Sequence, residues 1–156
     1  AHGGRARSRS RGNLRSVSVF VDTSALYALL VATDEASEGV VRAFRELVST
    51  VRPLFTTSYV LVEATALLQH RIGIAAVSDL DSAIVPLLGV EWVDESLHRK
   101  GIERLVREDR RDLSLVDCVS FEFMRERGIE TALAVDRHFA EAGFQLIPGM
   151  PRRKKR

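Results

Sequence analysis

The sequence contains a single cysteine, Cys118, so an internal disulfide and a cysteine-rich zinc site are both excluded. No apolar run approaches the roughly 20 residues that span a membrane, and no signal-peptide-like segment precedes the first predicted strand. Glycine-rich fingerprints of dinucleotide sites (GxGxxG) and P-loops (GxxxxGK[ST]) are also missing. With 156 residues, we expect one globular domain in a reducing, cytoplasmic compartment, with no membrane contact.

Lysines and histidines are too few or too scattered for several other chemistries. A phosphoreceiver domain needs a lysine after a late strand, and none of the three fits: Lys100, Lys154 and Lys155. Asp22 is not followed by a second aspartate at i+2, as aspartyl phosphatases of the haloacid dehalogenase type require. The histidines suggest no acid–base pair, and for His138 we expect a surface role although it lies two residues after Asp136.

Positive charge is concentrated at the two ends of the chain. Residues 1–16 carry five arginines, and residues 152–156 are all Lys or Arg. The body between them is therefore acidic, although the net charge is +2. We predict a basic disordered arm over 1–16, a folded domain over 17–148 and a basic tail over 149–156. Either end could contact nucleic acid or simply be solvated.

The stretch VSVFVDTSALYALL, residues 17–30, predicts a buried strand followed directly by a helix. Asp22 ends the apolar run, and Thr23 and Ser24 can cap the helix. TALAVDRHF, residues 131–139, repeats this order, with Asp136 after a second buried strand. In open α/β sheets ligands bind beyond the carboxyl ends of the strands, which is where both aspartates are expected. The alternative for Asp22 is a helix cap and nothing more.

Two further acids fall on predicted apolar helix faces. Glu63 lies in the predicted helix 57–71, which is apolar almost all round, and an unpaired buried carboxylate there is costly. Its alternative is an ion pair with an arginine such as Arg71. Asp117 lies on the apolar stripe of the helix in 112–128, but Ser114-x-x-Asp117 also matches a capping box.

Short strands and helices alternate along the rest of the chain. Helices are expected over 35–50, 74–88 and 96–108, and strands over 54–56, 90–93 and 144–147. In the 96–108 helix we expect Ile102 and Val106 to face inward, and in the charged run 104–112 a solvated face whose arginines could line an RNA path. This order favours parallel strands joined by crossover helices, which bring all strand ends to one edge.

Four carboxylates at that edge would repel one another, and a divalent cation is the usual remedy. Mg2+ and Mn2+ prefer oxygen ligands. A cation held there can polarise a phosphoryl oxygen and favour formation of hydroxide for in-line attack. The residues thus predict metal-dependent phosphodiester chemistry, with Asp22, Glu63, Asp117 and Asp136 as ligands.

Four blocks of the sequence resemble the motif regions of the PIN-domain ribonucleases: VFVDTSALYALL, TTSYVLVEATALL, LSLVDCVSFEFMRERGI and ALAVDRHFAEAGF. The resemblance covers about residues 17–148. It implies a three-layer α/β/α sandwich with a mainly parallel sheet, and cleavage of single-stranded RNA with Mg2+ or Mn2+. It also implies the same four acids as the metal site, Thr23 or Ser24 as a supporting hydroxyl and Asp112 as a weaker accessory.

The compact size is most similar to VapC-type toxins of toxin–antitoxin pairs. That resemblance implies an antitoxin partner besides the RNA substrate, and we also expect a homodimer. Two alternatives remain open from the sequence: a free-standing PIN nuclease of RNA maturation or turnover, and a PIN-fold RNA-binding scaffold without turnover.

Overall fold

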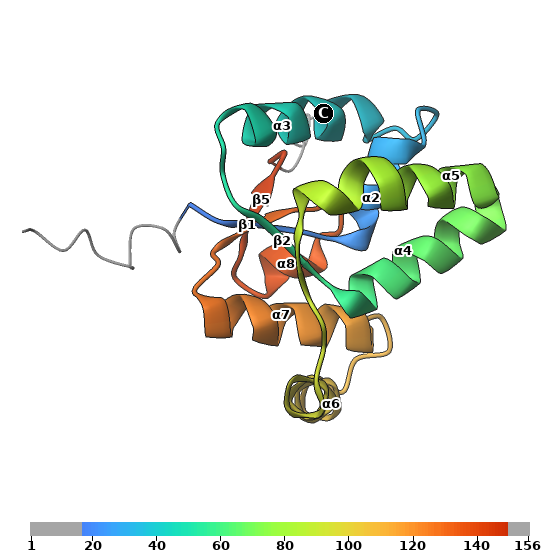
Figure 1. Cartoon of the computed structure of the whole chain (residues 1–156). Coiled ribbons are helices and arrows are strands. Elements are labelled where there is room, and N and C mark those ends of the chain that lie inside the picture. Colours follow the sequence, from blue (N-terminus) through green and yellow to red (C-terminus); the bar gives the residue numbers. More distant parts are fainter. Residues whose placement is uncertain (1–16, 150–156) are drawn as a thin grey trace, which may run out of the picture.

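A computed structural model describes residues 17–149 of the chain. The predicted arm over 1–16 and nearly all of the predicted basic tail lie outside the described residues. Between them runs a five-stranded sheet in the order β3-β2-β1-β4-β5, with every described pair parallel (Figure 1). The strands are β1 (Val19–Val21), β2 (Leu54–Thr57), β3 (Gly89–Glu91), β4 (Thr131–Leu133) and β5 (Gln145–Ile147). The predicted parallel α/β architecture is confirmed.

The order of the strands decides where a ligand can bind. The chain moves outward from β1 to β2 and β3, then returns to the other side of β1 for β4 and β5. The direction of winding therefore reverses between the neighbours β1 and β4. In open parallel sheets such a reversal leaves a crevice at the carboxyl ends of the two strands. Asp22 and Asp136 follow these two strands.

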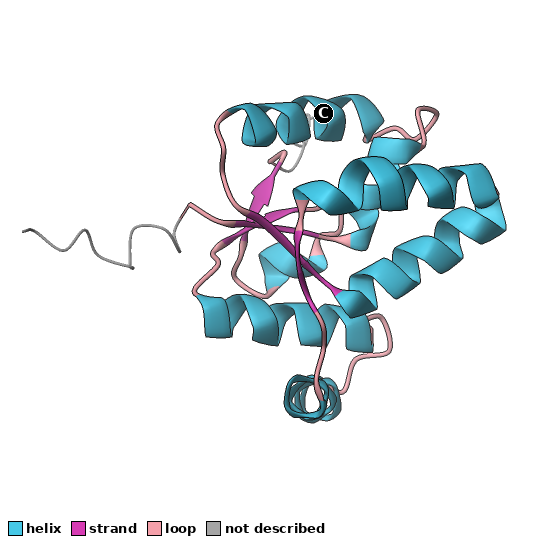
Figure 2. Cartoon of the chain, in the orientation of Figure 1, coloured by secondary structure: helices cyan, strands magenta, loops and turns pink. Residues whose placement is uncertain are grey.

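Seven α-helices surround the sheet in the described part of the chain (Figure 2). They are α2 (Thr23–Leu30), α3 (Ser37–Ser49), α4 (Ser58–Arg71), α5 (Ile74–Asp79), α6 (Glu95–Glu108), α7 (Leu115–Arg127) and α8 (His138–Glu141). In Figure 1, α3 lies above the sheet and α6 and α7 lie below it, while α4 contacts both α2 and α7. The sheet is therefore covered on both faces, as in a three-layer sandwich. No helix among residues 17–149 is both long and apolar enough to cross a membrane.

An aromatic cluster fills the space between the sheet and α7. The Phe20 ring of β1 lies 6.0 Å from Phe123 and 5.9 Å from Phe139, measured between centroids, and Phe121 meets Phe139 edge-on at 5.0 Å. Phe20, Phe121, Phe123 and Phe139 are all at most 1% exposed. These contacts join the central strand to α7 and α8, the two helices that carry Asp117 and His138.

The predictions for three helices need correction. The predicted 74–88 helix ends as an α-helix at Asp79 and continues as a π-helical turn (Leu80–Ile84) and a 3-10 turn (Val85–Leu87). Pro86 lies in this last turn, where it cannot donate the backbone hydrogen bond that would continue an α-helix. α4 is not buried all round, since the Val62 side chain is 70% exposed. In α6 Val106 is 73% exposed while Arg104 is 4% exposed, the reverse of the expected inward and outward faces.

Gly101 of α6 provides a test of the α6–α7 packing. A Cβ atom added there would lie well inside van der Waals contact with Val119 Cγ2 of α7. Alanine usually stabilises a helix interior by about 1 kcal/mol over glycine, but overpacking costs typically about 1–3 kcal/mol. We therefore expect Gly101→Ala to lower the melting temperature measured by circular dichroism.

Gly39 of α3 is the matched control, because its added Cβ would lie 3.7 Å from the nearest atom, Pro148 Cγ. Gly39→Ala should raise the melting temperature slightly. If both substitutions stabilise the protein, the close α6–α7 packing is wrong.

Candidate metal and active site

Asp22 is buried at the junction between β1 and α2. Its backbone ends the strand and its side chain caps the helix, accepting hydrogen bonds from the Ser24 backbone N–H (3.2 Å) and the Ser24 hydroxyl (2.7 Å). The residue is only 3% exposed, and burial raises the pKa of its carboxyl from 3.8 to about 7 against these hydrogen bonds. The predicted capping role is therefore present. Capping α2 does not by itself account for the free-energy cost of burying the Asp22 carboxyl.

Ser24 connects the ends of the two central strands. Its hydroxyl donates to Asp22 and accepts hydrogen bonds from the backbone N–H of Val135 (3.0 Å) and of Asp136 (3.4 Å). This arrangement holds the loop after β4 against the start of α2. Ser24 thus contacts both strand-end segments that carry the aspartates.

Asp117 enters from α7 on the lower side of the sheet. The predicted capping box is confirmed: Asp117 Oδ2 accepts from the Ser114 N–H, and the Asp117 N–H donates to Ser114 Oγ, both at 3.0 Å. These bonds fix the carboxylate at the first turn of α7, where it is 8% exposed. Burial raises the pKa of Asp117 and the nearby Asp136 charge adds to the effect. Asp117 can therefore cap α7 and at the same time belong to the group of acids around Asp136.

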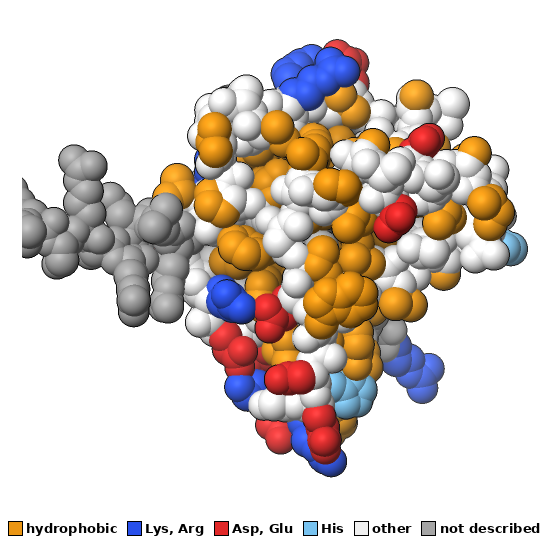
Figure 3. All heavy atoms as spheres, in the orientation of Figure 1, with side chains coloured by type: hydrophobic (Ala, Val, Ile, Leu, Met, Phe, Trp, Pro, Cys, Tyr) orange, Lys and Arg blue, Asp and Glu red, His pale blue; other side chains and the backbone are white. Residues whose placement is uncertain are grey.

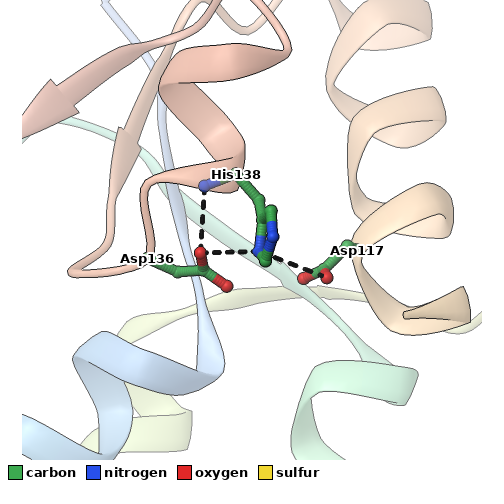
Figure 4. Close-up of side chains that lie close together, drawn as sticks. All are labelled: Asp117, Asp136 and His138. Atoms are coloured by element: carbon green, nitrogen blue, oxygen red, sulfur yellow. Dashed lines mark hydrogen bonds and ion pairs between the residues drawn. The ribbon is translucent and has the colours of Figure 1, made fainter. Parts of the chain in front are cut away.

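Asp117, Asp136 and His138 form the tightest group of potential ligands in the described chain. One ligand atom from each lies within 4.8 Å of the other two (Figure 4). His138 Nδ1 is 2.8 Å from Asp136 Oδ1 and 4.0 Å from Asp117 Oδ2, while the His138 backbone N–H also donates to Asp136 Oδ1. The expected surface role of His138 is wrong, because its side chain is only 14% exposed. The sequence did contain one indication of this position, because His138 lies two residues after Asp136 in a loop at the end of a strand.

Glu63 reaches the same region from α4 but is not buried as predicted. It is exposed, and no ion pair with Arg71 is found in the described structure; the Arg71 guanidinium instead lies 5.7 Å from the Tyr27 ring centroid. Partial desolvation raises the pKa of Glu63, and the charges of Asp117 and Asp136 raise it further. Glu63 therefore lies close enough to both aspartates to feel their charges, although it stands outside the tight group.

Asp112 has a different environment from the four acids. Its carboxylate accepts two hydrogen bonds from Arg110, at 3.1 and 2.7 Å, and its Oδ2 lies 3.1 Å from His138 Nε2. Arg110 and then His138 lower the pKa of Asp112. Asp112 thus orients the imidazole of His138 from the far side and does not join the carboxylate cluster.

The cluster has the electrostatics of a cation site. Asp22, Glu63 and Asp117 all have raised pKa values, and each is repelled by at least one other acid of the set. Within the described residues the buried Thr23 hydroxyl also lacks a well-formed hydrogen bond, although it is near enough to lower the pKa of Glu63 somewhat. Carboxylate and hydroxyl oxygens suit a hard divalent cation such as Mg2+ or Mn2+. The residues therefore fit such an ion.

The chain belongs to the PIN domain family, whose sequence model matches residues 19–145. Among curated proteins it is 38% identical over 127 residues to the 23S rRNA-specific endonuclease VapC20 of Mycobacterium tuberculosis, covering 81% of this chain and 95% of that protein.

Solved structures agree with this family. The crystal structure of VapC20, described as a sarcin–ricin loop cleaving toxin, superposes with a TM-score of 0.74 at 35% identity, covering 81% of this chain and 95% of that one. Two more distant structures share the fold with a TM-score of 0.61 each. FitAcB from Neisseria gonorrhoeae is 14% identical and covers 83% of this chain and 96% of that one, and PAE2754 from Pyrobaculum aerophilum is 18% identical and covers 86% and 91%.

The raised pKa of Asp22 predicts how stability depends on pH without metal. The folded state holds this proton more tightly than the unfolded chain, so its stabilising effect is complete below about pH 4 and is lost as the pH rises to about 7. In EDTA, Asp22→Asn should flatten the fall in melting temperature over this window and melt higher than the parent at pH 8. Thermal melts between pH 4.5 and 8 measure this.

Asp94 provides the control, because it is an exposed aspartate that caps α6 through the Leu97 N–H. Asp94→Asn removes a capping carboxylate outside the cluster and should not melt higher than the parent in EDTA at pH 8. An Asp22→Asn profile parallel to that of the parent would contradict the buried, mutually repelling cluster.

Glu63 tests the cation site by stability. Neutralising it removes repulsion from Asp117 and Asp136, so Glu63→Gln should melt higher than the parent in EDTA at pH 8. A ligand present at 100 times its Kd stabilises the folded protein by about 2.7 kcal/mol. Saturating Mn2+ should stabilise the parent on this scale and the variant clearly less. Glu46→Gln, an exposed change on α3, should behave as the parent. Equal shifts in all three proteins would rule out Glu63 as a ligand.

Proposed function

We propose that the protein is an endoribonuclease that cleaves single-stranded RNA with Mg2+ or Mn2+. The observation that carries this proposal is the cluster of carboxylates at the winding reversal between β1 and β4. Helix capping explains why Asp22 and Asp117 stand at their helix ends, but not why both lie beside Asp136 at a cost in burial and repulsion; a divalent cation would offset that cost. The 38% identity to an rRNA endonuclease over nearly its whole length supports the same activity.

Each acid has a defined part in this proposal. Asp22, Asp117 and Asp136, with Glu63 from the opposite side, would hold the divalent ion, and Thr23 would supply a neutral oxygen beside it. A bound ion would polarise the scissile phosphate and lower the pKa of a water molecule. Ser24 and the Ser114 capping box keep the ligands in position, and His138 lies beside Asp136, with its Nδ1 2.8 Å from Asp136 Oδ1.

We further propose that the protein is the toxin of a toxin–antitoxin pair. VapC20 is described as a toxin that cleaves the sarcin–ricin loop, and the two chains align over 95% of its length. Ribosomal RNA containing that loop is therefore the first substrate to test. An antitoxin partner, a homodimer and a cytoplasmic location belong to the same proposal.

The activity is tested with purified protein and an RNA carrying the sarcin–ricin loop. Cleavage should need Mg2+ or Mn2+ and stop with EDTA. Loss of residues that only support metal ligands usually costs about 10–100-fold, so Asp22→Asn, which removes a proposed ligand, should lower the rate by more than about 100-fold. Asp94→Asn, with an equivalent loss of charge at a helix cap, should cleave as the parent does. Undiminished cleavage by Asp22→Asn would refute the assignment.

A further inference from the structure

A cavity lies next to the carboxylate cluster, and His138 contacts both. Its volume is about 200 Å³, and three arginines line it together with two glutamates and His138: Arg104, Arg110, Arg125, Glu108 and Glu141. The imidazole of His138 forms a shared wall, because its Nδ1 side faces Asp136 and its Nε2 side faces Asp112. A group bound in this cavity would lie next to the proposed scissile phosphate.

Arg104 is an unusual residue for the wall of an open cavity. It is 4% exposed, its guanidinium lies 5.0 Å from the Phe121 ring centroid, and it pairs with Glu122 at 3.0 Å and Glu108 at 3.5 Å. Its Nε–H, also buried, has no hydrogen-bond partner among residues 17–149. Because this N–H is buried, Arg104 contributes its positive charge to the cavity wall and not an accessible hydrogen-bond donor.

The other two arginines differ in how firmly they are held. Arg110 pairs with Asp112 at 2.7 Å and with Glu141 at 3.0 Å, and these carboxylates raise its pKa. Arg125 is exposed, makes no ion pair within the described structure and donates only a long 3.4 Å hydrogen bond to the Ala142 carbonyl. It is thus the cation at this cavity that is available to a new anion.

The charges around this cavity are mixed. Arg104 and Arg110 are paired with carboxylates, namely Glu108, Glu122, Asp112 and Glu141, whereas Arg125 has no ion-pair partner among residues 17–149. Figure 3 shows charged side chains of both signs over the end of α6 that faces the viewer, and this end follows β3; the cavity lies toward the other end of the helix, where Arg104 and Glu108 are. Guanidinium groups bind phosphate oxygens through paired, directional N–H donors. Arg125, with its unpaired guanidinium at the mouth of this polar cavity, therefore favours a phosphate as ligand over a cation or an apolar group.

We propose that this cavity binds a backbone phosphate of the RNA adjacent to the phosphate that is cleaved, with Arg125 as its main contact. The proposal rests on the proposed nuclease function for the identity of the ligand. The neighbouring phosphate would fix the register of the strand, so that the next phosphodiester lies over the carboxylate cluster. Glu141 limits the affinity, because it competes for Arg110 and adds a negative charge to the wall.

The experiment measures binding of a short single-stranded RNA by fluorescence anisotropy in EDTA, at several salt concentrations. For a single strand, removing one protein–phosphate interaction lowers the slope of log K against log salt by about 0.7. Arg125→Gln should show a slope smaller by this amount and weaker binding at low salt. The control is Arg45→Gln on α3, an exposed arginine with no ion pair among residues 17–149, and this variant should bind as the parent does.

Glu141→Gln should change the affinity for RNA in the opposite direction. Removing its charge should tighten RNA binding, whereas Glu46→Gln on α3 should not. A purely structural role for the ion pairs around Arg110 would instead weaken binding on loss of Glu141. An unchanged salt slope in Arg125→Gln, or weaker binding by Glu141→Gln, would overturn the proposal.

Two further outcomes separate this inference from the proposed function. If the parent cleaves RNA but Arg125→Gln keeps its salt slope, the nuclease assignment stands and the phosphate site is wrong. If Arg125→Gln flattens the slope while the parent cleaves nothing, the cavity binds RNA and the nuclease assignment fails. Inorganic phosphate is the second probe: if it raises the melting temperature of the parent but not of Arg125→Gln, while the RNA slopes are equal, the site takes free phosphate and the RNA assignment is wrong.

Discussion

The constraint on which the rest of this structure depends is the burial of the Asp22 carboxylate at the end of the central strand. Three fully buried residues of β1 lead into it, and the helix that follows begins on its side chain. Burial favours the neutral form of this carboxyl and raises its pKa to about 7 even with the hydrogen bonds from Ser24. Ser24 offsets part of this cost and also ties down the loop that carries Asp136. The Ser24 hydroxyl thus links the buried Asp22 carboxylate to the loop that positions Asp136.

The remaining site residues reach this point by separate routes, and the packing of the core brings them together. The aromatic cluster around Phe20 holds α7 and α8 against the sheet, which places Asp117 and His138 opposite the strand ends. Asp117 is fixed further by its capping box. The packing and the capping box thus fix the carboxylate of Asp117 beside the strand ends, whereas Glu63 is exposed on α4.

Strand ends and caps could be predicted from the sequence because local chemistry decides them. An acid after a run such as VSVFV has to lie at a strand end, and Ser-x-x-Asp before an apolar run has to cap a helix. The exposure of Glu63, the burial of Arg104 and the position of His138 depend on which helix packs against which, and periodicity alone does not contain that information. The same applies to the cavity next to His138, whose walls come from α6, α7, α8 and the loop between α6 and α7.

The central claim is that the clustered carboxylates form a single divalent cation site. The most direct measurement is a calorimetric titration of Mn2+ into the metal-free protein at pH 7.5, for the parent and for Asp136→Asn. Asp136 suits this test because it belongs to the tight ligand group and is partly exposed, so its substitution leaves the core intact. The account predicts saturable binding by the parent and loss of that binding in the variant. Equal binding by both proteins, or no saturable binding by the parent, would contradict it.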